Sequence, residues 1–408
     1  PASQPSDSLQ SVLKEHPKRN EKMLRFCRLH RIQCTAAVLL LTLLSLLSFF
    51  FWSETEIAVN TAESNIQLQP QRHLKPASQI KDRPAGPPRI SFGTKYFGDN
   101  SGWKDYTTRW RENGQRSCGF DCDIVLDPAI ADAVLFHGRD LPSKPPKLQR
   151  KYWQYWVYMN MESPLSTKSY GYDVSSAPAY RFLFNWTATT MLESSVHMPY
   201  GMWSLRDKPV EGPFYSPQKK RYMAYIAFSN CKYSYNGRAE KIAELKRYID
   251  VHVYGKCGDR ALPKDWNVWR KISEEYRFYL SFENAFCRDY ITEKFHNNGL
   301  DSQAVPVAFG GLSRSDYERV SPPGSFVYAL DFPSMRQLAE HLKQLAADEA
   351  QYASYHEWKK RYEISPRSDL LCGTCARLHK DRSVGVFDLS RFYDIKRNCR
   401  PSYYKYLV

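Results

Sequence analysis

A run of apolar and aromatic residues that ends in polar ones marks the later part of the chain. Residues 276–283, YRFYLSFE, are apolar enough for a buried strand that surfaces at Glu283 and Asn284. Asp289 then stands where the N-cap of a helix is expected, and another strand is predicted over residues 304–309. The pattern predicts a βαβ unit, in which a ligand lies beyond the carboxyl ends of the strands.

The helix expected in this unit would carry a polar face. Tyr290, Glu293 and Lys294 lie at positions i, i+3 and i+4 and would share one side of it. Its first turn would offer free N–H groups and the positive end of the helix dipole to a phosphate, and Lys294 would add a full charge. On composition alone, an amphipathic helix with a solvated Glu and Lys is the favoured alternative.

A second βαβ unit is predicted upstream. Residues 222–228 alternate well enough for a strand that ends in Ser229 and Asn230. Residues 238–249 have helical spacing, and another strand follows. Two such units predict a doubly wound nucleotide-binding domain. Arg238 opposes the dipole at the start of its helix, which indicates an anion nearby, although a surface arginine is the plainer interpretation.

The preceding half shows shorter strand signals. Strands are predicted over residues 132–137 and from Lys151 towards Met161, and Glu162 follows the second of them in a Glu-Ser-Pro step. The residues alone favour an ordinary loop glutamate with a salt-bridge partner. Near the other end, residues 335–358 have the apolar spacing of a long packing helix.

An uncharged apolar run lies near the N-terminus. Residues 34–52, CTAAVLLLTLLSLLSFFFW, would span about 28 Å as a helix, close to the thickness of bilayer hydrocarbon. Basic residues precede it, which predicts a cytosolic N-terminus and a type II membrane protein. A cleaved signal peptide is the alternative, but its apolar core is usually shorter. The polar residues 53–88 are expected to form a stem.

Composition narrows the choice of partner and compartment. The net charge of +15 is compatible with nucleic acid, a membrane surface or a phosphate-bearing substrate. The sequence lacks helix-turn-helix, zinc-finger and RNP patterns, so nucleic acid is not expected. Eight of the ten cysteines lie after residue 100, an even number that suits disulfides in an oxidising compartment.

The sequence FEN, followed by DYITEK and then VPV, resembles the signature of the α1,3-fucosyltransferases of glycosyltransferase family 10. Further matches extend the likeness from about Arg89 to His379. The resemblance implies an α/β, GT-B-like fold with two Rossmann-like domains facing a cleft, preceded by the single transmembrane helix and stem. It also implies a single-pass type II protein of the Golgi membrane with a luminal catalytic domain. The chain departs from the family at Ala285, and in the stretch around Thr190, Met191 and Glu193.

The resemblance implies an inverting transfer of L-fucose from GDP-β-L-fucose to the 3-hydroxyl of N-acetylglucosamine. Glu162 matches the catalytic base of the family. The expected donor-binding residues are Ser229, Asn230, Arg238, Glu283, Asn284, Tyr290, Glu293 and Lys294. No metal is expected to be required. The DxD-like Asp121-Cys122-Asp123 lies between cysteines in one short loop and is not expected to bind one.

The resemblance also implies two disulfides from the Cys372-x-x-Cys375 motif back to Cys118 and Cys122, with the pairing order open, and Cys231 is expected to bond Cys257. Asn185 begins a sequon that a luminal site would allow to be glycosylated if it is exposed. The domains expected are a cytosolic tail (1–33), an anchor (34–52), a stem (53–88), an acceptor-side domain (89–213), a GDP-fucose-binding domain (214–362) and a C-terminal disulfide clasp with tail (363–408).

The acceptor is less defined. The sequence FENAFCRDYITEKF resembles the invertebrate and plant enzymes that act on the innermost N-acetylglucosamine of N-glycans, so an N-glycan or glycoprotein acceptor of this kind is expected. Lewis-type action on outer N-acetyllactosamine is the alternative. The departures at Thr190–Glu193 and Ala285 also leave open a membrane-tethered glycan-binding protein without catalysis.

Overall fold

The computed structural model describes residues 85–169, 176–232, 234–263, 265–365, 369–380 and 386–400, together with two short paired strands, β1 (Arg72–His73) and β16 (Ser383–Val384). These residues lie in one compact unit, Gln69–Val408. The expected membrane anchor at 34–52 lies outside the described residues. Within the described part, no helix has the length and apolar character needed to cross a bilayer.

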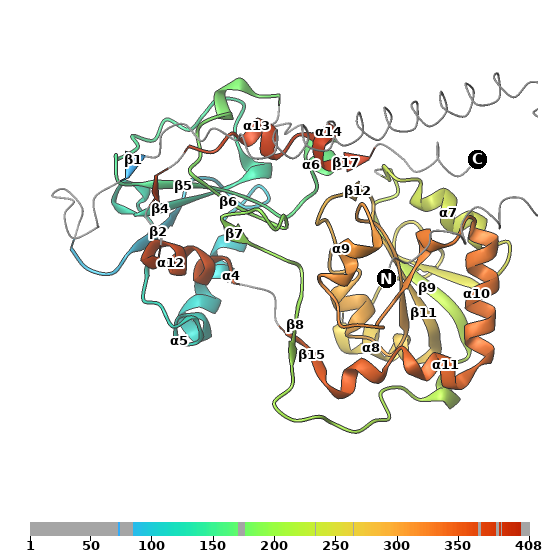
Figure 1. Cartoon of the computed structure of the whole chain (residues 1–408). Coiled ribbons are helices and arrows are strands. Elements are labelled where there is room, and N and C mark those ends of the chain that lie inside the picture. Colours follow the sequence, from blue (N-terminus) through green and yellow to red (C-terminus); the bar gives the residue numbers. More distant parts are fainter. Residues whose placement is uncertain are drawn as a thin grey trace, which may run out of the picture. The chain divides into compact units, whose positions relative to one another are not determined.

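The first half is built on a six-stranded parallel sheet (Figure 1). Its order is β3 (Asp123–Ile124), β2 (Arg89–Phe92), β4 (Ala133–His137), β5 (Tyr155–Asn160), β6 (Trp186–Thr189) and β7 (Val196–His197). Strands β4 and β5 are buried at every position, as expected for a parallel sheet covered on both faces. The shorter helices of this half are α4 (Ser101–Arg109), α5 (Gln115–Cys118) and α6 (Pro164–Ser169).

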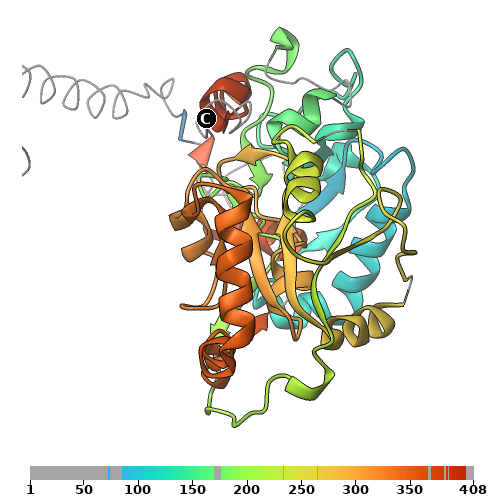
Figure 2. The ribbon, with the colours of Figure 1, turned by 90° about the vertical axis from the view of Figure 1, so that its right-hand side faces the viewer.

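The second half is built on a five-stranded parallel sheet. Its order is β10 (Val251–Tyr254), β9 (Tyr222–Ala227), β11 (Tyr276–Phe282), β13 (Val305–Phe309) and β14 (Val327–Tyr328). Two helices, α7 (Arg238–Leu245) and α10 (Met335–Ala347), pack on one face, where Figure 2 shows α10 lying along the strands. The helix α8 (Trp266–Glu275) packs on the other face. The expected doubly wound, parallel α/β architecture is therefore present in both halves.

Several predicted elements differ in extent. The single helix expected over 335–358 is divided at Asp348, whose carboxylate accepts from the N–H of Gln351 and caps a separate helix, α11 (Glu349–Ser354). The remaining elements of this half are the short α9 (Arg314–Glu318) and β15 (Tyr362–Ser365), which pairs antiparallel with β8 (Met202–Leu205) from the link between the halves.

The C-terminal residues return to the first half. The helix α12 (Leu370–Lys380) packs on one face of the first sheet, and α13 (Leu389–Phe392) packs on the other. Further along, α14 (Ile395–Asn398) leads into β17 (Cys399–Arg400), which pairs antiparallel with β12 (Phe286–Cys287) of the second half. The chain end thus contacts both halves. The finer domain boundaries at 213 and 362 stay predictions.

Four disulfides join the described cysteines. Cys118 bonds Cys372 and Cys122 bonds Cys375, which gives the pairing order that the sequence left open. Cys231 bonds Cys257, as expected. The fourth bond, between Cys287 and Cys399, was not predicted. Its partners are 112 residues apart, and local sequence carries no sign that the chain end reaches this strand.

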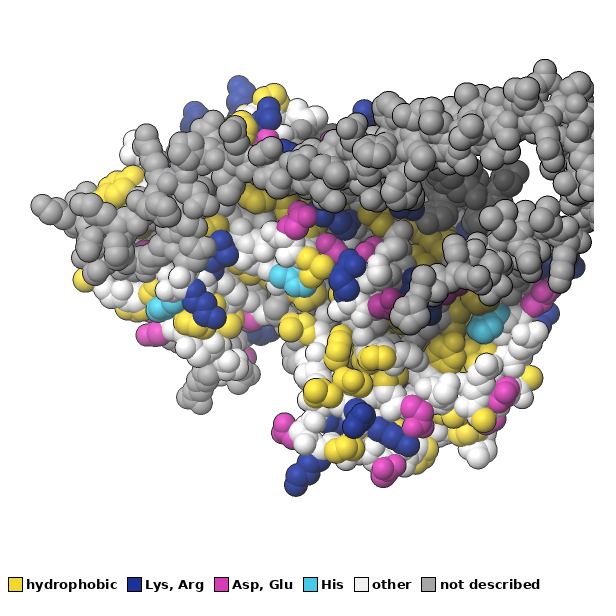
Figure 3. Space-filling model, in the orientation of Figure 1, with side chains coloured by type: hydrophobic (Ala, Val, Ile, Leu, Met, Phe, Trp, Pro, Cys, Tyr) yellow, Lys and Arg dark blue, Asp and Glu magenta, His cyan; other side chains and the backbone are white. Residues whose placement is uncertain are grey.

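The surface does not gather its positive charge in one place on the face seen in Figure 3. There, the described Lys and Arg side chains lie among acidic and apolar ones. Many basic groups are also paired; Arg206 with Glu363 and Arg288 with Glu193 are two examples.

Candidate active site

A pocket of about 500 Å³ lies beyond the carboxyl ends of β9 and β11. These two strands adjoin at the point where the strand order of the second sheet reverses, which is where ligands bind in doubly wound folds. The first half contributes Glu162 and Tyr200 to the lining. The second half contributes Ala227, Phe228, Ser229, Asn230, Arg238, Leu262, Pro263, Trp266, Trp269, Asn284, Tyr290, Glu293, Lys294 and Asn298.

Glu162 is held at the first half's side of the pocket. It follows β5, and its N–H donates to the Oδ1 of Asn160 over 2.9 Å. The hydroxyl of Tyr290, from the second half, donates to its Oε2 over 3.2 Å. Burial raises the pKa of Glu162 above its ordinary value, although Lys294 and Tyr290 act in the opposite direction. The arrangement is that of a carboxylate able to take up a proton from a bound hydroxyl.

Arg238 is a buried cation at the pocket wall. Its side chain is almost fully buried, and its guanidinium donates to the carbonyl oxygens of Asn230 over 3.0 Å and Phe282 over 3.3 Å. The group stacks over the ring of Phe228 at 4.5 Å, while its Nε has no partner. Among the described carboxylates, none lies within ion-pair distance of Arg238. Glu283 and Glu293 act on it only at longer range, and a buried arginine without a direct ion-pair partner is suited to an anionic ligand.

Lys294 takes part in a denser network. Its Nζ lies 3.0 Å from Glu293 Oε1 and 3.4 Å from Glu283 Oε2, and it donates to the Oγ1 of Thr292 over 2.9 Å. Burial alone would lower the pKa of Lys294, but the two carboxylates raise it above its ordinary value. Lys294 is therefore charged, with much of its charge compensated by neighbours. Arg238 is the less compensated of the two cations that line the pocket.

The helix predicted from Asp289 is absent, and that prediction is wrong. Asp289 has φ 56°, in the left-handed region, and turns lead to a five-residue π-helix, His296–Leu300. The physical reason is the buried carboxylate of Glu283, which accepts from the N–H of Thr292 over 2.7 Å and so satisfies a donor that an α-helix would have left for a phosphate. Asp289 itself pairs with Arg319 over 3.2 Å.

Tyr290, Glu293 and Lys294 nevertheless reach the same pocket, although by turns and not by one face of a helix. Glu283 does not: it is fully buried beneath Lys294 and is not among the lining residues. Its predicted role in holding donor hydroxyls stays a prediction; in the structure its carboxylate holds Thr292 and lies 3.4 Å from the Nζ of Lys294. Asn284 does line the pocket, with a buried Oδ1 that has no partner.

Some lining residues were not anticipated from the sequence. The side chain of Trp266, with an exposed fraction of 42 %, forms an apolar wall together with Leu262 and Pro263. The sequence did offer one sign of this helix: Asp265 is a favourable N-cap residue, and in the structure it caps α8, which begins at Trp266. Tyr200 lines the opposite side and donates to the carbonyl oxygen of Met161 over 3.0 Å.

The remaining predicted sites lie apart from the pocket. Asn185 is buried, and its Oδ1 accepts from the N–H of Trp156 over 2.9 Å and from the guanidinium of Arg150. Burial of this kind opposes the glycan that was expected there. The central residue of the DxD-like sequence 121–123 is Cys122, which forms a disulfide with Cys375. None of these three residues is among those that line the pocket.

Both halves of the chain match known protein families. Residues 103–201 match the family description "Fucosyltransferase, N-terminal", and residues 217–391 match "Glycosyltransferase family 10 (fucosyltransferase) C-term". The mouse protein named Alpha-(1,3)-fucosyltransferase 7 is 36% identical over 296 residues, which cover 71% of each chain. The chain belongs to glycosyltransferase family 10. The predicted family and enzyme class, an α1,3-fucosyltransferase, are thus confirmed.

Other members of family 10 show a similar extent of likeness. The human 4-galactosyl-N-acetylglucosaminide 3-alpha-L-fucosyltransferase FUT6 is 34% identical over 275 residues, which cover 64% of this chain and 72% of that protein. A solved structure described as an alpha1,3-fucosyltransferase with GDP-fucose covers 76% of this chain and 94% of its own, with 15% identity and a TM-score of 0.46.

Proposed function

We propose that this family 10 enzyme binds GDP-β-L-fucose in the pocket between its two halves and transfers L-fucose with inversion to the 3-hydroxyl of N-acetylglucosamine. The observation that carries the proposal is the pairing, across one pocket, of a carboxylate with a raised pKa and a buried arginine that has no direct ion-pair partner among the described carboxylates. In the direction of transfer, negative charge grows on the departing diphosphate while the acceptor hydroxyl loses a proton. The two groups match these two needs.

Arg238 and Lys294 would stabilise the diphosphate as the bond to fucose breaks. Arg238 supplies a planar fork suited to two phosphate oxygens, and Lys294 supplies a point charge. Two cations in a half-closed pocket can balance the leaving group electrostatically, so we propose that no divalent metal is required. Trp266 and its apolar neighbours offer a surface for the guanine ring of GDP, and Asn284 offers an amide for a hydroxyl of the donor.

Glu162 would act as the general base. Its carboxylate would accept the proton of the 3-hydroxyl as that oxygen attacks the anomeric carbon, and GDP would leave from the opposite face. One displacement of this kind converts the β-linked donor into an α-linked product. General base catalysis of this type contributes about 10²–10⁴ in rate.

For the acceptor, we propose outer N-acetyllactosamine, not the innermost N-acetylglucosamine that the sequence favoured. The support is that relatives at 34% identity carry names that specify a 4-galactosyl-N-acetylglucosaminide. We also propose a Golgi location with the catalytic part in the lumen. The four disulfides support an oxidising compartment of this kind.

A transfer assay tests the proposal. The fragment from Arg89 to Val408 is incubated with GDP-fucose and EDTA, in parallel with N-acetyllactosamine and with a trimmed N-glycopeptide. Transfer to the first acceptor in the presence of EDTA is expected. Transfer only to the glycopeptide would overturn the acceptor, and transfer only after metal is restored would overturn the metal-free mechanism.

The Glu162→Gln variant tests the base. It is expected to bind GDP like the wild type while turnover falls at least about a hundredfold. Unchanged turnover would remove Glu162 from its role. A wild-type protein that binds GDP-fucose but transfers to neither acceptor would instead indicate a glycan-binding protein without catalysis.

A further inference from the structure

Residues 386–400, here termed the C-terminal strap, are anchored on the first half. The N–H of Phe387 donates to the carbonyl oxygen of Phe184 over 2.8 Å, and the N–H of Leu389 donates to that of Arg181 over 2.9 Å. The side chains of Leu389, Phe392 and Tyr393 are buried in one apolar cluster with Tyr158 and Phe184 of the first half. This end of the strap is therefore part of the first half's core.

The other end of the strap is anchored on the second half. Cys399 is bonded to Cys287, both are buried, and their short strands pair antiparallel. The N–H of Arg288 donates to the carbonyl oxygen of Asn398 over 2.8 Å. Cys287 follows the pocket residue Asn284 by three positions and precedes Tyr290 by three, so the bond fixes the segment that carries both pocket residues.

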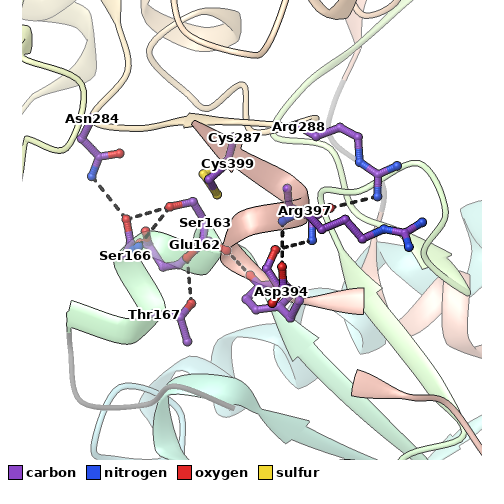
Figure 4. Close-up of a disulfide and its surroundings, with 12 residues drawn as sticks. Glu162, Ser163, Ser166, Thr167, Asn284, Cys287, Arg288, Asp394, Arg397 and Cys399 are labelled. Carbon is purple, nitrogen blue, oxygen red and sulfur yellow. Dashed lines mark hydrogen bonds between the residues drawn. A yellow bond between two sulfur atoms is a disulfide. The ribbon is translucent and has the colours of Figure 1, made fainter. Parts of the chain in front are cut away.

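Between its two anchors the strap contacts the backbone that carries Glu162. The hydroxyl of Tyr393 donates to the carbonyl oxygen of Glu162. In Figure 4, the Cys287–Cys399 disulfide has Glu162 and Ser166 on one side of it and Arg288 on the other. Leu165 and Ile395 pack against the apolar cluster of Cys287, Cys399 and Tyr290. The segment that follows β5 (162–166, the base loop), the strap, and the pocket segment 284–290 (the donor loop) therefore share one set of contacts.

Two polar contacts run beside this cluster. Asn284 Nδ2 lies 3.5 Å from the Oγ of Ser166. Ser166 belongs to α6, the helix that begins just after Glu162. Arg288 makes a two-point pair with Glu193 of the first half at 2.6 and 3.0 Å, and also donates to the Oδ1 of Asn398. Relative motion is the default for two domains joined by linkers, so such contacts determine how far apart the base and the donor lie.

We propose that the C-terminal strap is a positioning device for the transfer reaction: Tyr393 positions Glu162, and the Cys287–Cys399 bond ties that position to the donor loop. The inference rests on the proposed function, since it takes Glu162 as the base. A displacement of about 1 Å between reacting groups is enough to cost roughly 10²-fold in rate. The strap acts on that spacing and contributes no group to the pocket itself.

The Tyr393→Phe variant tests the first part. It keeps the buried ring and removes the hydroxyl, and with it the hydrogen bond to Glu162 and the one to Thr167 of α6. We expect kcat to fall about tenfold while the KM for GDP-fucose and the Kd for GDP stay within about twofold. Tyr180→Phe is the matched control, because Tyr180 is a buried tyrosine of the same cluster whose hydroxyl donates to a carbonyl oxygen, that of Pro142, away from Glu162.

Rates are expressed per GDP-binding site, so that a loss of folded enzyme does not count as a loss of turnover. If Tyr180→Phe lowers kcat as much as Tyr393→Phe does, the effect is general loosening of the core and the positioning role is overturned. Wild-type kcat in Tyr393→Phe overturns it as well.

The double variant Cys287→Ala/Cys399→Ala tests the tie. We expect a fall in kcat of about tenfold with GDP binding retained. Cys118→Ala/Cys372→Ala is the control, since that bond joins α5 to α12 on the first half alone. Equal kcat values in the two double variants would overturn the tie. Failure of the proposed function is distinguished by Glu162→Gln: if that variant keeps its turnover, the base is misassigned whatever the strap variants show.

Discussion

Replacement of Arg238 by Lys tests which cation carries the donor's diphosphate. Lysine retains the charge but loses the planar fork, so one of two expected phosphate contacts is lost. A hydrogen bond to a charged group contributes roughly 1.5–3 kcal/mol, and 1.4 kcal/mol corresponds to about a tenfold change in affinity. The Kd for GDP is therefore expected to rise roughly 10- to 150-fold in Arg238→Lys. Titration calorimetry with GDP and no acceptor measures this directly.

The variant also disturbs the wall of the pocket, so a control is needed. Arg150 is a half-buried arginine of the first half that donates to the carbonyl oxygens of Leu183 and Gln154 and stacks on the ring of Trp156. Arg150→Lys makes the same chemical change outside the pocket lining. It should lower the melting temperature and leave the Kd for GDP unchanged. If Arg238→Lys binds GDP like the wild type, the argument from a buried arginine without a direct ion-pair partner is refuted.

Three further outcomes are expected. Because burial raises the pKa of Glu162, kcat should fall as the pH drops through a value above the ordinary carboxyl range, and a pH–rate profile without that limb would contradict the assignment. Burial lowers the pKa of His296 to about 4 from 6.5, so between these values the folded state binds fewer protons than the unfolded state. The free energy of unfolding should therefore fall as the pH drops from about 6.5 towards 4. His296→Leu should flatten this dependence, as measured by urea denaturation at each pH. Cys122→Ala/Cys375→Ala removes a disulfide between residues 253 apart, so the unfolded chain gains conformational freedom and the free energy of unfolding should fall by about 2–5 kcal/mol. An unchanged midpoint of urea denaturation would contradict this.

The comparison of prediction with structure separates two kinds of information. The strands expected over 222–228 and 276–283 are present as β9 and β11, because alternating or continuous burial is written into neighbouring residues. The start of α7 at Arg238 was likewise legible from its apolar spacing. Half of the sixteen lining residues were also expected, some because they follow the ends of these strands and others because they match the family motifs.

The helix expected from Asp289 shows the limit of such reasoning. Its spacing and its N-cap were both favourable, yet the segment forms turns. The competing interaction comes from Glu283 at the end of β11, whose buried carboxylate binds the N–H and hydroxyl of Thr292. Local propensity is a weak preference, and a charge-assisted hydrogen bond in a buried place outweighs it.

The sequence by itself determined the parallel α/β character, the family and the chemical types gathered at the carboxyl ends of the second sheet. Only the tertiary structure decided that Glu283 lies beneath the pocket, that Arg238 has no direct ion-pair partner among the described carboxylates, and that the chain end ties Cys287 to the first half through Cys399 and Tyr393. The reason is physical. Burial patterns repeat over a few residues and can be read locally, whereas charge compensation and cross-links depend on which segments the fold brings together, and the Cys287–Cys399 bond joins residues 112 apart.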